Sequence, residues 1–183
     1  MIFHATPLAG LFEIEAPTVA DSRGRFTRLY CELALAEVAP GARVLQVNHS
    51  LSLARGTVRG LHFQREGALE GKLLRCLRGR VFDVALDLRR ESPTFACWHA
   101  VELSAENARQ VWIPPGFAHG FQTLSDDAEL LYFHTAAYSP VHEAGLRFDD
   151  PRLAIAWPLA PTQLSARDLA LPVLDESFEG LRT

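Results

Sequence analysis

Residues 72–88 read KLLRCLRGRVFDVALDL and carry the clearest structural pattern of the chain. Two apolar runs, at 73–77 and 81–88, flank Arg78-Gly79-Arg80, and a short glycine-containing connection of this kind predicts an antiparallel hairpin. In the second run the aspartates fall on one face of a strand and the intervening apolar residues on the other, as the two-residue period of a strand requires. The stretch therefore predicts a β-sheet protein.

The same punctuation continues on both sides of this stretch. Short runs rich in valine, leucine and phenylalanine alternate with glycine, proline, asparagine and aspartate. This pattern is typical of an all-β sandwich or barrel. Further strands are predicted at 43–53, 97–103, 110–113 and 129–135, and one short helix at 31–39, where Pro40-Gly41 ends it. We expect residues from about 150 to 183 to wrap the core as turns and short helical pieces, so that residues 1–183 form one domain.

Composition limits the classes of partner. The chain has 183 residues, of which 48% are hydrophobic and 22% charged, which is ordinary for a globular domain with a sizeable core. Its formal net charge is −4 and it has no long basic tract. There is thus no electrostatic reason to expect a nucleic acid or an anionic membrane as partner. Scattered arginines still suit a small anionic ligand, because a guanidinium binds phosphate oxygens in pairs.

The cysteines and the N-terminus bear on location. Cys31, Cys76 and Cys97 are odd in number and lack a C-x-x-C spacing. We expect them to be reduced and buried, as in a cytoplasmic protein. The N-terminus shows no basic segment followed by an apolar run, and no apolar stretch approaches the length that crosses a bilayer. The sequence therefore predicts a cytoplasmic protein.

Lys72 is the only lysine, whereas seventeen residues are arginine. Lysine offers a compact point charge and arginine a wide, planar fork of donors, so the two are not interchangeable in a site. A site that needs a point charge would explain the single lysine, and a codon bias against lysine would explain it equally well. His62, in the stretch RGLHFQ at 59–64, lies ten residues before it.

A second motif, Pro114-Pro115-Gly116-Phe117-Ala118-His119, fits P-x-G-x-x-H and resembles the second motif of the cupin superfamily of jelly-roll barrels. Metal-binding cupins would supply H-x-H in the first motif, but His62-Phe63-Gln64 lacks the second imidazole. A divalent metal site usually has three or four protein ligands, and these two histidines have no clear carboxylate partner. We therefore expect no metal.

The same residues suit acid/base chemistry without a metal. The pKa of a histidine lies near neutrality, so His62 can take and return a proton, and a carboxylate on its far nitrogen would fix the tautomer. A lysine ammonium could stabilise an oxyanion, and a tyrosine hydroxyl could deliver a proton from the opposite side. Each residue also has an ordinary explanation: His62 as a strand residue, Tyr132 as a core aromatic, and Asp168 as a helix or loop carboxylate. Spacing alone does not place Asp168 near His62.

The chain resembles the dTDP-4-dehydrorhamnose 3,5-epimerase family over nearly its whole length and in the same order. The matching segments are 21–26, 46–50, 56–64, 72–75, 83–89, 92–94, 103–107, 113–121, Tyr132, Tyr138, 149–151 and 164–168. The resemblance implies a cupin-like jelly roll with short peripheral helices. It also implies a homodimeric enzyme that needs no cofactor and inverts C3 and C5 of dTDP-4-dehydro-6-deoxy-D-glucose.

The resemblance assigns roles residue by residue. His62 would be the general base oriented by Asp168, Lys72 would stabilise the enolate at the C4 oxygen, and Tyr132 would reprotonate from the opposite face. The implied substrate-binding residues are Arg59 and Arg167 at the diphosphate, His119 in the sugar pocket, Gln46 and Asn48 beside the ligand, Tyr138 near the nucleobase, and Arg23 and Phe26 from the neighbouring subunit.

Several positions depart from the family pattern. Arg28 stands where most members carry glutamate, which removes a hydrogen-bond acceptor and reverses a charge in the segment that faces the nucleobase. Phe63 replaces a tyrosine, and His134 and His142 are unexpected imidazoles. The alternatives left open are a C3-only epimerase, an epimerase of another nucleotide-linked 4-keto sugar, a metal-dependent cupin and a non-catalytic module that binds sugar nucleotides.

Overall fold

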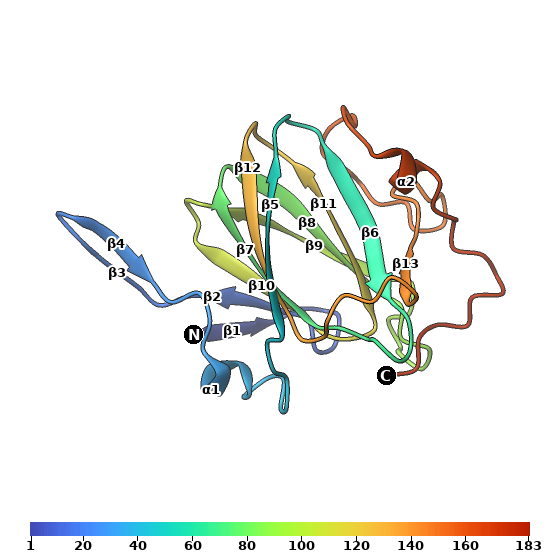
Figure 1. Cartoon of the computed structure of the whole chain (residues 1–183), viewed down its shortest axis with the longest axis horizontal. Coiled ribbons are helices and arrows are strands. Elements are labelled where there is room, and N and C mark those ends of the chain that lie inside the picture. Colours follow the sequence, from blue (N-terminus) through green and yellow to red (C-terminus); the bar gives the residue numbers. More distant parts are fainter.

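The computed structural model describes residues 1–183 and consists of antiparallel sheets with two one-turn helices (Figure 1). The six-stranded sheet has the order β1 (Ile2–Ala5), β2 (Phe12–Glu15), β10 (Arg109–Ile113), β7 (Lys72–Arg78), β12 (Ala128–His134) and β5 (Gln46–Ser52). The five-stranded sheet has the order β13 (Glu143–Gly145), β6 (Val58–Gln64), β11 (Phe117–Thr123), β8 (Arg80–Asp87) and β9 (Trp98–Ser104). The hairpin of β3 (Thr18–Asp21) and β4 (Gly24–Thr27) extends away from both sheets (Figure 1). The predicted all-β class is confirmed.

The predicted hairpin at 72–88 is wrong, although both of its strands exist. β7 pairs with β10 and β12, whereas β8 pairs with β11 and β9 in the other sheet. Gly79, at φ +68, makes the connection between the two sheets. β8 lies inside the five-stranded sheet, where β11 and β9 occupy both of its edges, so no edge of β8 remains for β7. The sequence pattern does not distinguish a turn within one sheet from a connection between two.

The main core lies between the two sheets, where apolar side chains from both inner faces meet. Leu74, Cys76, Val111 and Leu130 come from the six-stranded sheet, and Val81, Ala85, Phe117 and Phe121 from the five-stranded sheet. Asp83, on the same face of β8 as Val81 and Ala85, is also buried. A carboxylate in this interior needs a partner, and the partner is a histidine of the cavity described below.

A second core covers the outer face of the five-stranded sheet. Val84 and Leu86 of β8 point outward, opposite to Asp83, and pack against Leu153 and Leu174 of the C-terminal segment. That segment runs beside β6 and β13 (Figure 1) and carries the second helix, α2 (Ala166–Leu169). The alternation predicted for this strand therefore separates two buried faces, and the outer one needs the C-terminal segment as cover.

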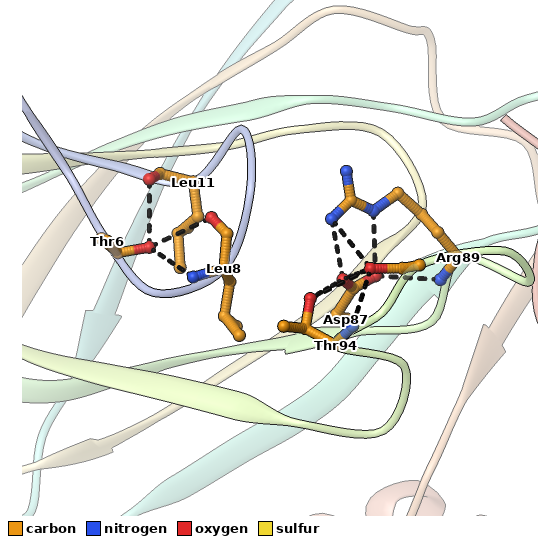
Figure 2. Close-up of polar contacts among 7 residues, drawn as sticks. Thr6, Leu8, Leu11, Asp87, Arg89 and Thr94 are labelled. Carbon is orange, nitrogen blue, oxygen red and sulfur yellow. Dashed lines mark hydrogen bonds and ion pairs between the residues drawn. The ribbon is translucent and has the colours of Figure 1, made fainter.

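A buried polar cluster fixes the connection after β8 (Figure 2). Asp87, fully buried, accepts hydrogen bonds from Arg89 Nε (2.9 Å) and Nη2 (2.7 Å) and from the hydroxyls of Ser92 (2.6 Å) and Thr94 (2.7 Å). Burial alone would raise the pKa of Asp87, but these donors lower it below its usual value. Figure 2 also shows Thr6 bonded within the loop between β1 and β2.

The other local predictions have mixed outcomes. The strands expected at 43–53, 97–103, 110–113 and 129–135 are confirmed as β5, β9, β10 and β12. The helix expected at 31–39 is only one turn long, α1 (Glu32–Leu35). Beyond it, Glu37 N and Val38 N bond to the carbonyls three residues earlier, which tightens the chain into turns before Pro40. Proline also disfavours a helical conformation in the residue before it.

The prediction that the cysteines are buried is correct for only one position. All three thiols are free, but only Cys76 is buried, while Cys97 is exposed and Cys31 half-buried. Cys97 immediately precedes β9 and lies outside the strand. None of the helices has the length and apolar character required to span a membrane.

Candidate active site

A cavity of about 720 Å³ opens between the two sheets. Strands β5, β7 and β12 of the six-stranded sheet face β6 and β11 of the five-stranded sheet across it, and residues 163–168 border it. Ten of the twelve predicted site residues line the cavity: Gln46, Asn48, Arg59, His62, Lys72, His119, Tyr132, Tyr138, Arg167 and Asp168. The fold thus brings together residues that lie more than a hundred positions apart in the chain.

His62 and Asp168 form a hydrogen-bonded pair. Nε2 of His62, on β6, lies 2.7 Å from Oδ1 of Asp168, on α2. Ser165 caps this helix, because its hydroxyl accepts a hydrogen bond from Asp168 N (3.0 Å), and the cap fixes the aspartate at the cavity. The Asp168 side chain is only 6% exposed. Because a carboxylate only accepts hydrogen bonds, Nε2 of His62 carries the proton and donates to it, which leaves Nδ1 as the free, basic nitrogen.

The surroundings of His62 keep its imidazole neutral. Burial is the largest influence and lowers the pKa of His62, and the positive charges of Lys72 and Arg167 act in the same direction. The hydrogen bond and charge of Asp168 oppose this shift but do not reverse it. A neutral imidazole at neutral pH has the protonation state that a general base needs.

Lys72 is enclosed in the cavity wall. Its side chain is 8% exposed, and Nζ lies 3.1 Å from Glu70 Oε1 and 3.4 Å from the carbonyl oxygen of His62. The ammonium therefore sits beside the backbone of the histidine that carries the basic nitrogen. A point charge in a site that excludes water acts strongly on a nearby oxygen that gains negative charge.

Tyr132 faces His62 from the other sheet. It lies on β12 of the six-stranded sheet, whereas His62 lies on β6 of the five-stranded sheet, and both line the same cavity. Burial raises the pKa of Tyr132 well above its ordinary value, so the phenol keeps its proton. Its hydroxyl lies 3.4 Å from Ser50 Oγ. A neutral imidazole and a protonated phenol thus face the cavity from opposite walls.

A second histidine–aspartate pair includes His119, which lines the cavity. His119 Nε2 is 2.9 Å from Asp83 Oδ2, and both side chains are almost completely buried. His119 is the neighbour of His62 across β6 and β11, and its ring lies 6.0 Å from that of Tyr132. No group of three or more histidine, cysteine, aspartate or glutamate side chains is arranged to hold a metal ion.

The two predicted phosphate-binding arginines lie at the rim of the cavity. Arg59 Nε donates to Ser52 Oγ (3.0 Å), while Arg167 Nη2 pairs with Glu143 Oε1 (2.5 Å) and remains 53% exposed. Glu143 also accepts from the Tyr138 hydroxyl (2.8 Å), which raises the pKa of Tyr138. Two guanidinium groups therefore stand at the rim, where an anionic ligand can reach them.

Arg23 and Phe26 lie outside this cavity, on the β3–β4 hairpin. Phe26 is 78% exposed, and Arg23 pairs only with Asp21 of the same hairpin. Arg28, just beyond the hairpin, is exposed as well. The structure does not bring these residues to the site of their own chain.

The remaining departures from the family pattern fall in different places. Phe63 points away from the cavity into the second core, and His142 bonds to Ser139 (2.8 Å) outside the cavity. His134, by contrast, lines the cavity, as do Glu70 and Glu143, which the sequence reasoning did not single out. Glu70 lies two residues before the only lysine, and that proximity was a signal for a counter-ion.

Comparisons with known proteins identify the family. The family model described as dTDP-4-dehydrorhamnose 3,5-epimerase matches residues 5–176. The enzyme of that name from Salmonella typhimurium is 47% identical over 181 residues, which cover 97% of this chain and 98% of the relative. A dTDP-4-dehydrorhamnose 3-epimerase from Streptomyces niveus is 40% identical over 171 residues, covering 93% and 82%.

A solved structure is similar throughout. It is the dTDP-6-deoxy-D-glucose-3,5-epimerase of Legionella pneumophila in complex with dTDP-4-keto-L-rhamnose, at a TM-score of 0.93 and 41% identity. The similarity covers 100% of this chain and 98% of that one. The two antiparallel sheets therefore have the jelly-roll arrangement of these proteins, and the expected fold class is confirmed.

Proposed function

The chain belongs to the dTDP-4-dehydrorhamnose 3,5-epimerase family, and we propose that it converts dTDP-4-dehydro-6-deoxy-D-glucose into dTDP-4-dehydro-L-rhamnose by inverting C3 and C5. The observation that carries this proposal is the placement of a base and an acid on opposite walls of one cavity. His62, oriented by Asp168 at 2.7 Å, faces the cavity from one sheet, and Tyr132 faces it from the other.

The proposed reaction has the same two steps at each carbon. His62 Nδ1 removes the proton from the carbon next to the C4 ketone, and the electron pair of that bond forms an enolate with its charge on the C4 oxygen. Lys72 stabilises this oxygen with its ammonium. Tyr132 then donates its proton to the opposite face of the carbon, and the ketone reforms. Exchange with water removes the proton from His62 and restores the proton of Tyr132.

The remaining cavity residues are assigned to binding. Arg59 and Arg167 hold the diphosphate, since both stand at the rim with guanidinium donors. Gln46 and Asn48 position the ligand, and His119 lines the sugar pocket. Tyr138 lies at the nucleobase.

Assembly and location are part of the proposal. Arg23 and Phe26 would complete the site of a second copy in a homodimer, which is supported by the exposed β3–β4 hairpin that reaches away from the body of its own chain. Residues 1–183 would form one domain, and the protein would act in the cytoplasm without a cofactor.

A C3-only epimerase is the second candidate, because one similar protein is named as a 3-epimerase. The nucleobase should be tested as well, because Arg28 reverses the charge at a position where most family members carry glutamate. The cavity itself favours an enzyme over a silent binding module, because binding alone requires no histidine oriented by a buried aspartate.

The test is turnover of purified protein with dTDP-4-dehydro-6-deoxy-D-glucose, with the product followed by NMR. The wild type is expected to form the L-rhamno product and His62→Ala to lose nearly all activity. His142→Ala, which removes an imidazole outside the cavity, serves as the matched control and should retain activity. Near-normal turnover by His62→Ala would contradict the proposal.

A further inference from the structure

The cavity contains a third acid–histidine pair that the reaction above does not use. Glu70 and His134 are both largely buried, and His134 Nδ1 lies 2.8 Å from Glu70 Oε2. The other carboxylate oxygen of Glu70 lies 3.1 Å from Lys72 Nζ. One carboxylate thus connects an imidazole to the ammonium that is assigned to the enolate oxygen.

The hydrogen bonds around this pair have one consistent direction. An ionised carboxylate only accepts hydrogen bonds, so Nδ1 of His134 carries the ring proton and donates a hydrogen bond to Glu70. Nε2 of His134 is then an acceptor, and Asn48 Nδ2 lies 3.4 Å from it. Asn48 Oδ1 accepts in turn from Gln46 Nε2 (3.1 Å), and Gln46 Oε1 accepts from the backbone of Tyr138 (3.1 Å). Every donor in this series of hydrogen bonds points toward Glu70.

Strand pairing sets these side chains at one level. His134 of β12 is the register partner of Lys72 on β7 and of Gln46 on β5. The His134 ring also stacks on Tyr132, with ring centroids 5.9 Å apart and planes 12° apart. His134 therefore lies beside both Lys72 and Tyr132, although it has no proton transfer of its own in the proposed reaction.

We propose that Glu70 and His134 are positioning residues that hold the Lys72 ammonium at the enolate oxygen, with His134 fixing the carboxylate that fixes the lysine. This inference rests on the proposed function, because it gives Lys72 its role. A lysine side chain has four rotatable bonds, and Glu70 alone could turn with it. The hydrogen bond from His134 to Oε2 prevents that rotation and leaves Oε1 directed at Nζ.

The charge of Glu70 supports this arrangement. Burial alone would raise its pKa, but the hydrogen bond from His134 and the charge of Lys72 together hold the pKa below its ordinary value. Glu70 is thus ionised and serves as the counter-ion of a buried ammonium that would otherwise lack one. Because Glu70 also binds His134, its negative charge neutralises the Lys72 ammonium only in part. The ammonium can therefore still act on the substrate oxygen.

The kinetic test uses two variants of one residue. In His134→Asn the side-chain amide nitrogen takes the place of Nδ1 and keeps the donor to Glu70, whereas His134→Leu removes it. Both variants lose the stacked ring, so their difference isolates the hydrogen bond. We expect His134→Leu to lower kcat about 10- to 100-fold with little change in KM, since a misplacement of about 1 Å costs rates of this order. We expect His134→Asn to stay within a few-fold of the wild type.

The matched control is His99→Gln. His99 Nε2 lies 3.0 Å from Glu13 Oε1, so this substitution alters a histidine–glutamate pair of similar length outside the cavity. It should leave kcat unchanged. Equal losses in His134→Leu and His134→Asn, or no loss in either, would overturn the inference.

A second readout does not depend on turnover. Because Lys72 is the only lysine, labelling with [13C,15N]-lysine gives one set of side-chain signals. We expect His134→Leu and Glu70→Gln to shift these signals by more than His134→Asn does, because loss of the ring is common to both His134 variants, and we expect His99→Gln to preserve the signals. Unchanged signals in His134→Leu would overturn the positioning role even where kcat falls. A wild type that is inactive on the sugar nucleotide would refute the proposed function, while the signals would still decide whether the pair holds Lys72.

Discussion

Asp168→Ala tests the orienting pair of the site directly. The substitution removes a hydrogen bond of 2.7 Å to His62 in a place where the carboxylate is only 6% exposed. When His62 takes a proton in the transition state, this bond joins two charged groups, and such bonds contribute about 1.5–3 kcal/mol. At about 1.4 kcal/mol for each tenfold change in rate, its loss lowers kcat by about 10- to 150-fold.

The same substitution predicts a shift in the pH profile with a definite sign. Asp168 is the largest influence that raises the pKa of His62, while burial, Lys72 and Arg167 lower it. Without Asp168 the pKa of His62 falls further. The acid limb of kcat, where protonation removes the base, therefore moves to lower pH than in the wild type.

The assay is kcat against pH for the wild type, Asp168→Ala and Asp149→Ala. Asp149→Ala is the control, because it also removes an aspartate that is paired with a basic side chain, Arg147 at 2.7 Å, but this pair lies outside the cavity. It should leave kcat and the acid limb in place. An Asp168→Ala enzyme with unchanged kcat, or with its acid limb at higher pH, would refute this account of His62.

Three further predictions follow from the same geometry. Lys72→Arg is expected to lose most of kcat in the turnover assay although it keeps the charge. A wide, planar guanidinium can still pair with Glu70, but it does not place one compact charge at the ketone oxygen as the Lys72 ammonium does. Wild-type activity would contradict the point-charge role. Tyr132→Phe should still exchange substrate hydrogen with solvent, measured by mass spectrometry in deuterated water, but should form little inverted product; normal inversion would show that another group is the acid. Leu86→Ala should lower the free energy of unfolding by about 2–5 kcal/mol in urea titrations, because this fully buried side chain packs in the second core under the C-terminal segment.

Local patterns predicted the strands well and their arrangement poorly. The two-residue period at 81–88 correctly separated Asp83 from Val84 and Leu86. It did not show that both faces are buried, nor that β7 and β8 belong to different sheets. Pairing is decided by which edges remain free in the whole fold, and a short glycine turn carries no information about that.

The site was predictable only through the resemblance. Nothing in the spacing of 106 residues between His62 and Asp168 indicates a contact, because the one-turn helix α2 reaches β6 through a long irregular segment. Glu70 and His134 were missed as a pair for a related reason. Glu70 precedes β7 while His134 ends β12, and only the register of the two strands brings the carboxylate and imidazole to 2.8 Å.

The most direct test of the central claim is incubation of the wild-type protein with dTDP-4-dehydro-6-deoxy-D-glucose in deuterated water, with exchange at C3 and C5 followed by NMR. The proposed mechanism predicts deuterium at both carbons together with the inverted product, since His62 and Tyr132 act from opposite walls. Deuterium at C3 alone would establish a monoepimerase. Absence of exchange at both carbons would contradict acid/base epimerisation of this substrate.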